Sequence, residues 1–220
     1  SLILAEKHAA WSNIARKIAH EVKNPLTPIK LSAERIEKKF KSKDLNENEI
    51  SKLAQTISKQ VDDIGKLVDE FSSFARMPKA EMKIDNLSET IKESFNLFSN
   101  AHSSINFQLQ NPDTEIVFLF DRFQITQALN NLIKNSIEAV SNIHNSSIKI
   151  EYYQEMNNIY ILICDNGIGV DDKKIIKLFE PYYTTKDKGT GLGLSIVKKI
   201  IEDHNGTITI KKNTKTAGTT

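Results

Sequence analysis

The chain has 220 residues, and its 30 basic and 28 acidic side chains give a formal net charge of +2 at neutral pH. This balance lacks the basic face of a nucleic-acid-binding domain, so we predict no nucleic-acid partner. The single cysteine, Cys164, excludes an internal disulfide and a zinc site made of several cysteines. No apolar run approaches the roughly 18 residues of a membrane span, and we therefore expect a soluble, cytoplasmic type of fragment.

Residues 1–77 show the pattern of two helices. Apolar residues recur at spacings of three, four and seven between Trp11 and Phe40, and again between Ile50 and Phe74. This spacing predicts two amphipathic helices, and the polar stretch 41–49 between them predicts the loop of an antiparallel hairpin. One hairpin buries little apolar surface. We therefore predict a homodimer in which residues 1–75 form a four-helix bundle; the alternative is that the stripe packs on the second domain.

A histidine in the first helix has an unusual context. His20 lies off the apolar stripe and is followed by Glu21, with Asn24 one turn further on and Pro25 and Pro28 beyond it. Prolines inside a helix cost about 3 kcal/mol each, so their presence suggests a functional bend. An exposed imidazole beside a carboxylate can act as a nucleophile, although a surface histidine without a role is the plainer interpretation. Asn24 stands where the H-E-x-x-H zinc motif needs a second histidine, so a zinc site is not predicted.

Residues 78–86, which contain Pro78, are predicted to be a linker or hinge, and residues 87–220 a second domain. The second domain mixes the two periodicities. Helices are predicted over 87–100, 122–141, 171–179 and 192–204, and strands over 105–110, 115–120, 148–154, 158–165 and 206–211. Interleaved helices and strands predict an α/β sandwich with a sheet covered on one face, so the whole chain is of the α+β class.

Two stretches of the second domain could bind a nucleotide. Asn131 and Asn135 lie four residues apart on one helix face, where their amide oxygens could bind Mg²⁺ or simply face water. Asp165 ends an apolar strand and is followed by Gly167 and Gly169. Its carboxylate could accept a hydrogen bond from the exocyclic amine of adenine, while the glycines would let a base approach the backbone. The alternative is a plain turn.

The next stretch, residues 179–195, contains a glycine run that opens a predicted helix. Backbone N–H groups at a helix N-terminus bind phosphate, and Lys186 could add a positive charge. The run Gly189, Gly191 and Gly193 has the spacing of neither the Rossmann nor the Walker motif. A glycine run alone is weak evidence. The four pieces in this order predict a nucleotide pocket.

These segments resemble the bacterial two-component sensor histidine kinases, and the resemblance is closest to the NtrY-type branch of nitrogen regulation. The segment H-E-V-K-N-P-L-T-P-I-K-L-S-A-E-R-I is similar to the dimerisation and phosphoacceptor helix of that family. Four further segments are similar to its nucleotide-binding boxes: N-N-L-I-K-N-S-I-E-A to the N box, D-N-G-I-G to the G1 box, F-E-P-Y-Y-T-T-K to the F box and G-T-G-L-G-L-S to the G2 box. The resemblance covers nearly the whole chain and implies a GHKL-type fold for the second domain.

The resemblance also implies roles, with ATP and Mg²⁺ as cofactors. His20 would take the γ-phosphate of ATP, Glu21 would assist removal of its proton, and Asn24 would position a water for dephosphorylating a response regulator. Asn135 would hold Mg²⁺ and Asp165 would read adenine. The residues implied to bind nucleotide are Asn131, Asn135, Asp165, Gly167, Gly169, Phe179, Lys186, Gly189, Thr190, Gly191, Leu192 and Gly193. The phosphoryl group would then pass to an aspartate of a response-regulator receiver domain, expected to be NtrX-like. Any anchoring in the inner membrane would depend on upstream segments.

Departures from the family and two rival functions remain open at this stage. Ser136 stands where the family usually has alanine, and the sequence stops at Thr220, where relatives continue with a final strand, so one sheet edge is expected to be unpaired. The first rival is a conformational ATPase of the same fold, with Glu138 as the base that activates water. The second is a module that binds nucleotide without catalysis and serves as a scaffold or as a phosphatase directed at the regulator.

Overall fold

The computed structural model describes the backbone of residues 2–43, 46–75, 78–111, 113–184, 190–213 and 218–220. Within these ranges, the side chains of residues 2–18, 20, 70, 73–75 and 172–173 are not described. The chain divides into two compact units, Ser1–Met77 and Pro78–Thr220, which we call unit 1 and unit 2.

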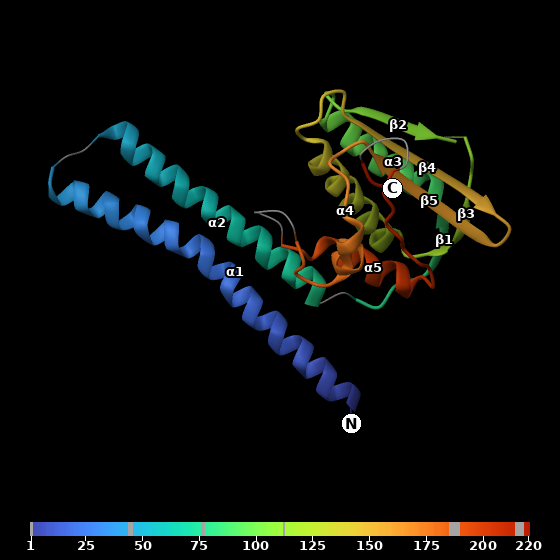
Figure 1. The fold of residues 1–220 in the computed structure, drawn as a ribbon, viewed down its shortest axis with the longest axis horizontal. Helices are drawn as coiled ribbons and strands as arrows, with labels where there is room; N and C mark the ends of the chain where they lie inside the picture. Colours follow the sequence, from blue (N-terminus) through green and yellow to red (C-terminus); the bar gives the residue numbers. More distant parts are fainter. Residues whose placement is uncertain (1, 44–45, 76–77, 112, 185–189, 214–217) are drawn as a thin grey trace. The chain divides into compact units, whose positions relative to one another are not determined.

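Unit 1 is a helical hairpin, made of α1 (Leu2–Lys41) and α2 (Glu47–Ala75) (Figure 1). An ion pair of 2.6 Å between Lys39 Nζ and Glu49 Oε2 joins the helices beside their connection. The Asn46 side chain accepts hydrogen bonds from the backbone N–H groups of Asn48 and Glu49, which caps the first turn of α2. Part of the predicted loop therefore belongs to α2, but the predicted hairpin is confirmed.

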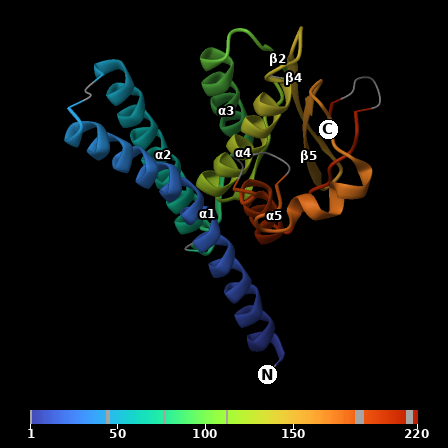
Figure 2. The same cartoon turned by 60° about the vertical axis from the view of Figure 1, so that its left-hand side comes forward.

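The helix α1 continues through Pro25 and Pro28, and its axis changes direction along its length (Figure 2). Each proline removes one backbone donor, and the i→i−4 pattern identifies the carbonyls that lose it as those of Glu21 and Asn24. The bend therefore falls in the segment that contains the predicted nucleophile. In the described part of the chain, no helix is both long enough and apolar enough to cross a bilayer.

Unit 2 combines two small sheets with helices. Its helices are α3 (Leu87–Ala101), α4 (Arg122–Val140), the 3₁₀ helix η1 (Asp172–Phe179) and α5 (Gly193–Asp203). One sheet pairs β1 (Lys83–Asn86) antiparallel with β3 (Val117–Phe120). The other has the order β2 (Asn106–Gln110), β4 (Ser147–Glu155) and β5 (Asn158–Asp165); β2 runs parallel to β4, and β5 runs antiparallel to it.

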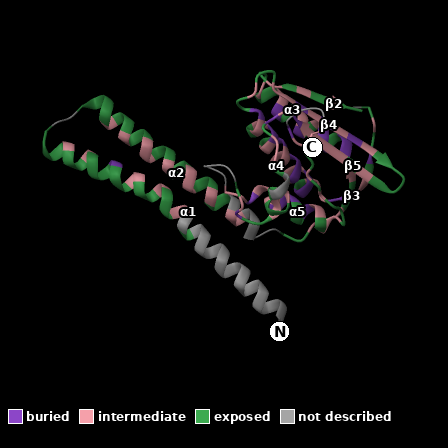
Figure 3. Ribbon diagram, in the orientation of Figure 1, coloured by how far each residue is buried: buried purple, intermediate pink, exposed green. Residues whose placement is uncertain are grey.

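The core of unit 2 lies between the larger sheet and its helices. The alternate residues Ile148, Ile150 and Tyr152 of β4 are fully buried, as the period of a strand with one covered face requires. Figure 3 shows that buried residues are concentrated in unit 2, whereas the described part of unit 1 is mostly exposed or half-buried. The predicted α/β sandwich is confirmed.

Two predicted elements differ in the structure. The last four residues of the predicted linker 78–86 form β1 because they pair with β3. The strand predicted over 206–211 is wrong: the described residues there form no ladder, and the pairing is limited to one bridge, Lys212 with Thr219, flanked by reciprocal hydrogen bonds between Lys211 and Thr220. A strand exists only where a neighbour supplies its hydrogen-bond partners.

Candidate functional site

The predicted phosphoacceptor segment lies on α1. Its backbone is helical throughout, Glu21 is half-buried and Asn24 is exposed, while the side chain of His20 lies outside the described residues. Thr27 Oγ1 donates to the carbonyl of Lys23 at 3.3 Å, a bond to the i−4 carbonyl of a kind that often bends a helix. Asn24 is therefore exposed to water on a segment whose axis bends.

The carboxylate of Asp165 is held by three elements of unit 2. It ends β5 and is only 6% exposed. Its Oδ1 accepts the backbone N–H of Gly167 at 2.9 Å and that of Thr219 at 3.2 Å, and Ser136 of α4 adds a side-chain hydrogen bond. Burial raises the pKa of Asp165, and these three bonds oppose that rise. A buried carboxylate in a fixed orientation is suited to read a polar ligand group.

The turn after β5 packs against α4 and so brings two predicted pieces together. A Cβ on Gly167 would lie 2.6 Å from the carbonyl oxygen of Ala139, which also accepts the N–H of Ile168 at 3.3 Å. Ala139 is one turn beyond Asn135, which is one turn beyond Asn131, so the half-buried asparagines lie on the same face as the contact. Gly169 has φ +70°, a left-handed backbone that glycine adopts without strain.

The two ends of the predicted phosphate loop are joined. Tyr182 donates its backbone N–H to the carbonyl of Gly191 at 2.8 Å. Gly191 has φ +68°, and a Cβ there would lie 2.5 Å from the carbonyl carbon of Tyr182. Phe179 is half-buried at the end of η1. Segments on either side of residues 185–189 therefore meet through their backbones, with glycine required at the contact.

The start of α5 leaves room for a ligand. Leu192, which is 1% exposed, precedes the helix and donates its backbone N–H to the hydroxyl oxygen of Thr190 at 3.4 Å. A Cβ on Gly193 would meet no atom within 4 Å, so the space beside its backbone is open. Backbone N–H groups at this end of a helix favour an anion. Lys186 and Gly189, also predicted to bind phosphate, lie outside the described residues.

The fold and these contacts can be set beside known proteins. Residues 10–79 match the family model "His Kinase A (phospho-acceptor) domain", and residues 120–220 match "Histidine kinase-, DNA gyrase B-, and HSP90-like ATPase". The two matches cover the hairpin with His20 and the part of unit 2 that holds Asp165 and the glycines. The chain belongs to the two-component sensor histidine kinases.

Relatives place this histidine kinase chain in the NtrY branch, as the sequence predicted. It is 43% identical over 94% of its length to the nitrogen regulation protein NtrY of Azorhizobium caulinodans, and 36% identical over 99% to a putative NtrY-like sensor histidine kinase of Rickettsia bellii. It spans 28% and 35% of the length of these relatives. Among solved structures, the histidine kinase ThkA in complex with the response regulator TrrA matches with a TM-score of 0.76 and 28% identity, over 95% of this chain and 60% of that one.

Sequence reasoning missed two residues of the kinase's site. Ser136 is buried and hydrogen-bonded to Asp165, whereas the sequence showed only that it stands where the family usually has alanine. Tyr182 is buried, and burial raises its pKa to about 12. The run Pro181-Tyr182-Tyr183 held a signal for the latter, because an aromatic residue at the root of a loop often anchors it.

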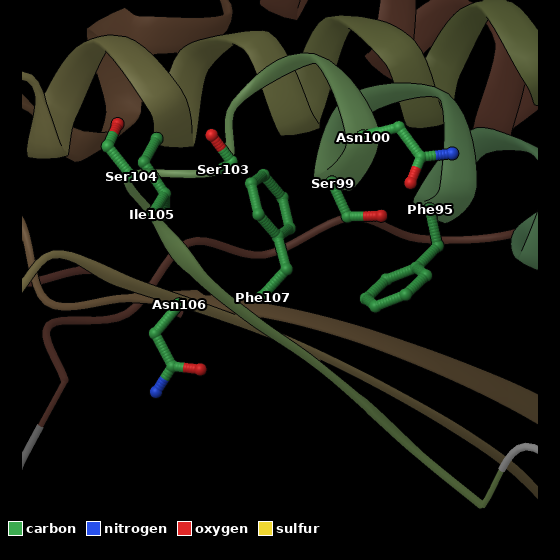
Figure 4. A pocket seen from close by; sticks show the side chains of 8 residues that line it. All are labelled: Phe95, Ser99, Asn100, Ser103, Ser104, Ile105, Asn106 and Phe107. Atoms are coloured by element: carbon green, nitrogen blue, oxygen red, sulfur yellow. The ribbon is translucent and has the colours of Figure 1, made fainter.

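A surface hollow of about 610 Å³ lies elsewhere in unit 2, between the end of α3 and the start of β2 (Figure 4). The rings of Phe95 and Phe107 form an edge-to-face pair in its wall, with centroids 6.1 Å apart, and the remaining lining consists of Ile105 with serine and asparagine side chains. Among the described residues, its lining contains no predicted nucleotide-binding residue and no charged side chain. This hollow is separate from the candidate site of the kinase.

Proposed function

We propose that the chain is the catalytic portion of a sensor histidine kinase, which transfers a phosphoryl group from ATP to His20 and then to an aspartate of a response regulator. The observation that carries this proposal is the combination of two features in one chain. One is the buried carboxylate of Asp165, which accepts three hydrogen bonds and lies beside glycines where a side chain would clash. The other is a helical hairpin with a His-Glu pair at a proline bend.

The residues of unit 2 fit an adenine nucleotide. Asp165 would accept a hydrogen bond from the adenine amine, and Gly167 and Gly169 would shape the wall beside it. The phosphates would lie toward Thr190–Gly193, where the backbone at the start of α5 is open. In the described part of the chain, no cluster of three or more His, Cys, Asp or Glu side chains could hold a metal. Mg²⁺ would therefore depend on Asn135 together with phosphate oxygens, a usual division of its ligands.

The chemistry required of the protein is mostly positioning. ATP supplies the phosphoryl group. One imidazole nitrogen of His20 would attack the γ-phosphorus as the bond from that phosphorus to the bridging oxygen breaks and ADP leaves. Glu21 would orient the ring and take the proton from the other nitrogen. Lys186 would offset negative charge during transfer. Unit 2 would have to carry its site to the hairpin, and the junction of the two units, just before Pro78, is the natural hinge.

Partners and location follow from the same proposal. Two hairpins would pair as a four-helix bundle, because the single hairpin leaves apolar side chains exposed to water. Leu26 is 48% exposed, Leu31 52% and Val61 53%. The regulator's receiver domain, proposed to be NtrX-like, would dock on this bundle; the solved ThkA complex names such a pairing for that kinase. Asn24 would position water for regulator dephosphorylation. We place the chain in the cytoplasm, with the complete protein anchored in the inner membrane.

The decisive test is incubation of the chain with γ-labelled ATP and Mg²⁺. The protein should acquire label that is lost in acid and stable in alkali, as a phosphoramidate is. His20→Gln should abolish the label, and Asp165→Asn should reduce it through weaker nucleotide binding. His144→Gln is the matched control, because His144 is exposed in unit 2 and has no proposed role. Label that persists in His20→Gln would exclude the mechanism.

The rival functions give different outcomes in the same assay. A conformational ATPase would release phosphate without labelled protein, and its activity would depend on Glu138, which is exposed at the end of α4. A binding module without catalysis would bind ATP normally and transfer nothing to any receiver domain.

The proposed dimer is tested by sedimentation equilibrium. Val61→Glu should dissociate it by placing a charge in the apolar stripe of α2, while Ser58→Glu, at an exposed position on the same helix, should leave it intact. A monomeric parent chain would contradict the proposal.

A further inference from the structure

His204, at the end of α5, makes two hydrogen bonds through its ring. Its Nδ1 lies 2.8 Å from the carbonyl oxygen of Ile200, and its Nε2 lies 3.0 Å from the backbone N of Asp121. A carbonyl can only accept and a backbone N–H can only donate, so Nδ1 carries the proton and Nε2 supplies the lone pair. The geometry thus fixes one neutral tautomer and uses both ring nitrogens.

Asp121 is in turn hydrogen-bonded to the first residues of unit 2. Its Oδ1 caps α4 by accepting the N–H of Gln124 at 3.0 Å, and its Oδ2 accepts the N–H of Glu81 at 2.8 Å. Gln124, only 1% exposed, donates from Nε2 to the carbonyl of Pro78 at 3.0 Å. The backbone of Pro78 to Glu81 is therefore bonded to the start of α4 at two points, and His204 bonds the start of α4 to α5.

The two ends of α5 therefore contact different parts of unit 2. Its first turn begins at Gly193, beside the proposed phosphate position, and its last residue precedes His204. A helix of this length moves as a rigid element, so a displacement of its first turn also displaces its last turn. Through Asp121, that end reaches the segment of unit 2 that continues directly from the hairpin.

We propose that His204 is a positioning residue, which joins the nucleotide helix α5 through Asp121 to the segment Pro78–Glu81 and so sets how unit 2 delivers its phosphoryl group to His20. We call these hydrogen bonds of His204, Asp121 and Gln124 the clamp, and its existence rests on the bond geometry alone. Its effect on transfer rests on the proposed kinase function.

The test uses the whole chain and compares His204→Phe, which keeps a ring but removes both nitrogens, with His204→Gln, whose amide retains a donor and an acceptor. His102→Phe is the matched control, because His102 is another half-buried histidine of unit 2. In His204→Phe, amide hydrogen exchange at Asp121 should accelerate by about fivefold or more, because its N–H loses the acceptor on His204. Exchange at Glu81 should accelerate as well, because its N–H is bonded to the side chain of Asp121. The other two variants should stay closer to the parent chain.

Kinetics separate positioning from a merely structural role. In His204→Phe the KM for ATP and the affinity for a non-hydrolysable ATP analogue should stay unchanged, while the rate constant for labelling His20 falls, and His204→Gln should restore part of it. Equal transfer rates in all variants would overturn the proposal. So would a weaker analogue affinity that accounts for the whole loss, since His204 would then act only on the pocket.

Nitrogen NMR of the unmodified chain provides a measurement that needs no variant to fold. The His204 ring should show a protonated Nδ1 and an unprotonated Nε2 at neutral pH; the opposite tautomer would refute the clamp. If exchange and NMR agree with the clamp but even the parent chain never labels His20, the kinase proposal fails while the clamp remains.

Discussion

Gly191 offers the sharpest test of the nucleotide loop, because Gly193, two residues away, is a matched control. At Gly191 an alanine would adopt a left-handed φ of +68° and place its Cβ 2.5 Å from the carbonyl carbon of Tyr182. At Gly193 the same Cβ would meet nothing within 4 Å, and no positive φ is required. The two substitutions therefore add the same methyl group to the same motif with opposite steric consequences.

The expected magnitudes follow from these two environments. The left-handed conformation costs an alanine about 1–2 kcal/mol. Forcing a methyl group against backbone atoms, which cannot swing away, adds roughly 1–3 kcal/mol. Gly191→Ala should therefore destabilise unit 2 by about 2–5 kcal/mol. Gly193→Ala should leave stability unchanged or raise it by up to about 1 kcal/mol, since alanine favours the helix.

Urea denaturation followed by far-UV circular dichroism measures this difference. With a slope of about 1–3 kcal/mol per molar urea, the unit 2 transition of Gly191→Ala should move down by roughly 1 M or more. Titration with a fluorescent ATP analogue then separates folding from binding. Gly193→Ala should keep its transition but bind the analogue more weakly, because its Cβ occupies the open space beside the proposed phosphate position.

Equal urea midpoints for the two variants would refute the argument, because the contact between Gly191 and Tyr182 would then contribute nothing to stability. Unchanged affinity of Gly193→Ala for the ATP analogue would contradict the proposal that the phosphates bind at the start of α5.

Three further predictions concern titration. Because burial raises the folded-state pKa of Asp165, the chain should lose stability relative to Asp165→Asn as the pH rises from 3.8 through that raised pKa, and urea midpoints measured across this range should show it. The pKa of Asp85 is lowered, first by the backbone N–H of Asn86 and then by Arg122. Arg122→Gln should therefore lower the urea midpoint at neutral pH, and should lower it less below pH 3.8. The exposed control Lys134→Gln should show no such difference between the two pH values. Ultraviolet titration at alkaline pH should reveal one late tyrosine, with a pKa of about 12, that is absent from Tyr182→Phe.

Local patterns predicted most of the elements. The pattern over residues 148–154 predicted the strand β4. In the structure its alternate residues Ile148, Ile150 and Tyr152 are buried, because burial of one strand face imposes a period of two. The spacing of apolar residues predicted α1 and α2 for the same reason, with a different period. Asp165 could be selected because a charged residue directly after an apolar strand must find partners where the strand ends.

Contacts between distant residues could not be predicted in this way. Residues Lys83–Asn86 look like a linker when taken alone and become β1 only because Val117–Phe120 lies beside them. Residues 206–211 have the composition of a strand, but the described neighbours supply no ladder. The role of Ser136 depends on the approach of α4 to β5, which no spacing within α4 reveals.

The convergence on Asp165 explains why this carboxylate suits a recognition role. Its partners come from the turn that contains Gly167, from Ser136 on α4 and from Thr219, so three separate segments must be in place before its orientation is set. A group held this way loses little freedom when a ligand arrives, and less of the binding free energy is spent on ordering it. The burial that raises its pKa also strengthens any hydrogen bond it accepts, because the local dielectric is low. Under the proposed function, recognition of the base would therefore be rigid, while the transfer step would depend on how the segment Pro78–Glu81 is held.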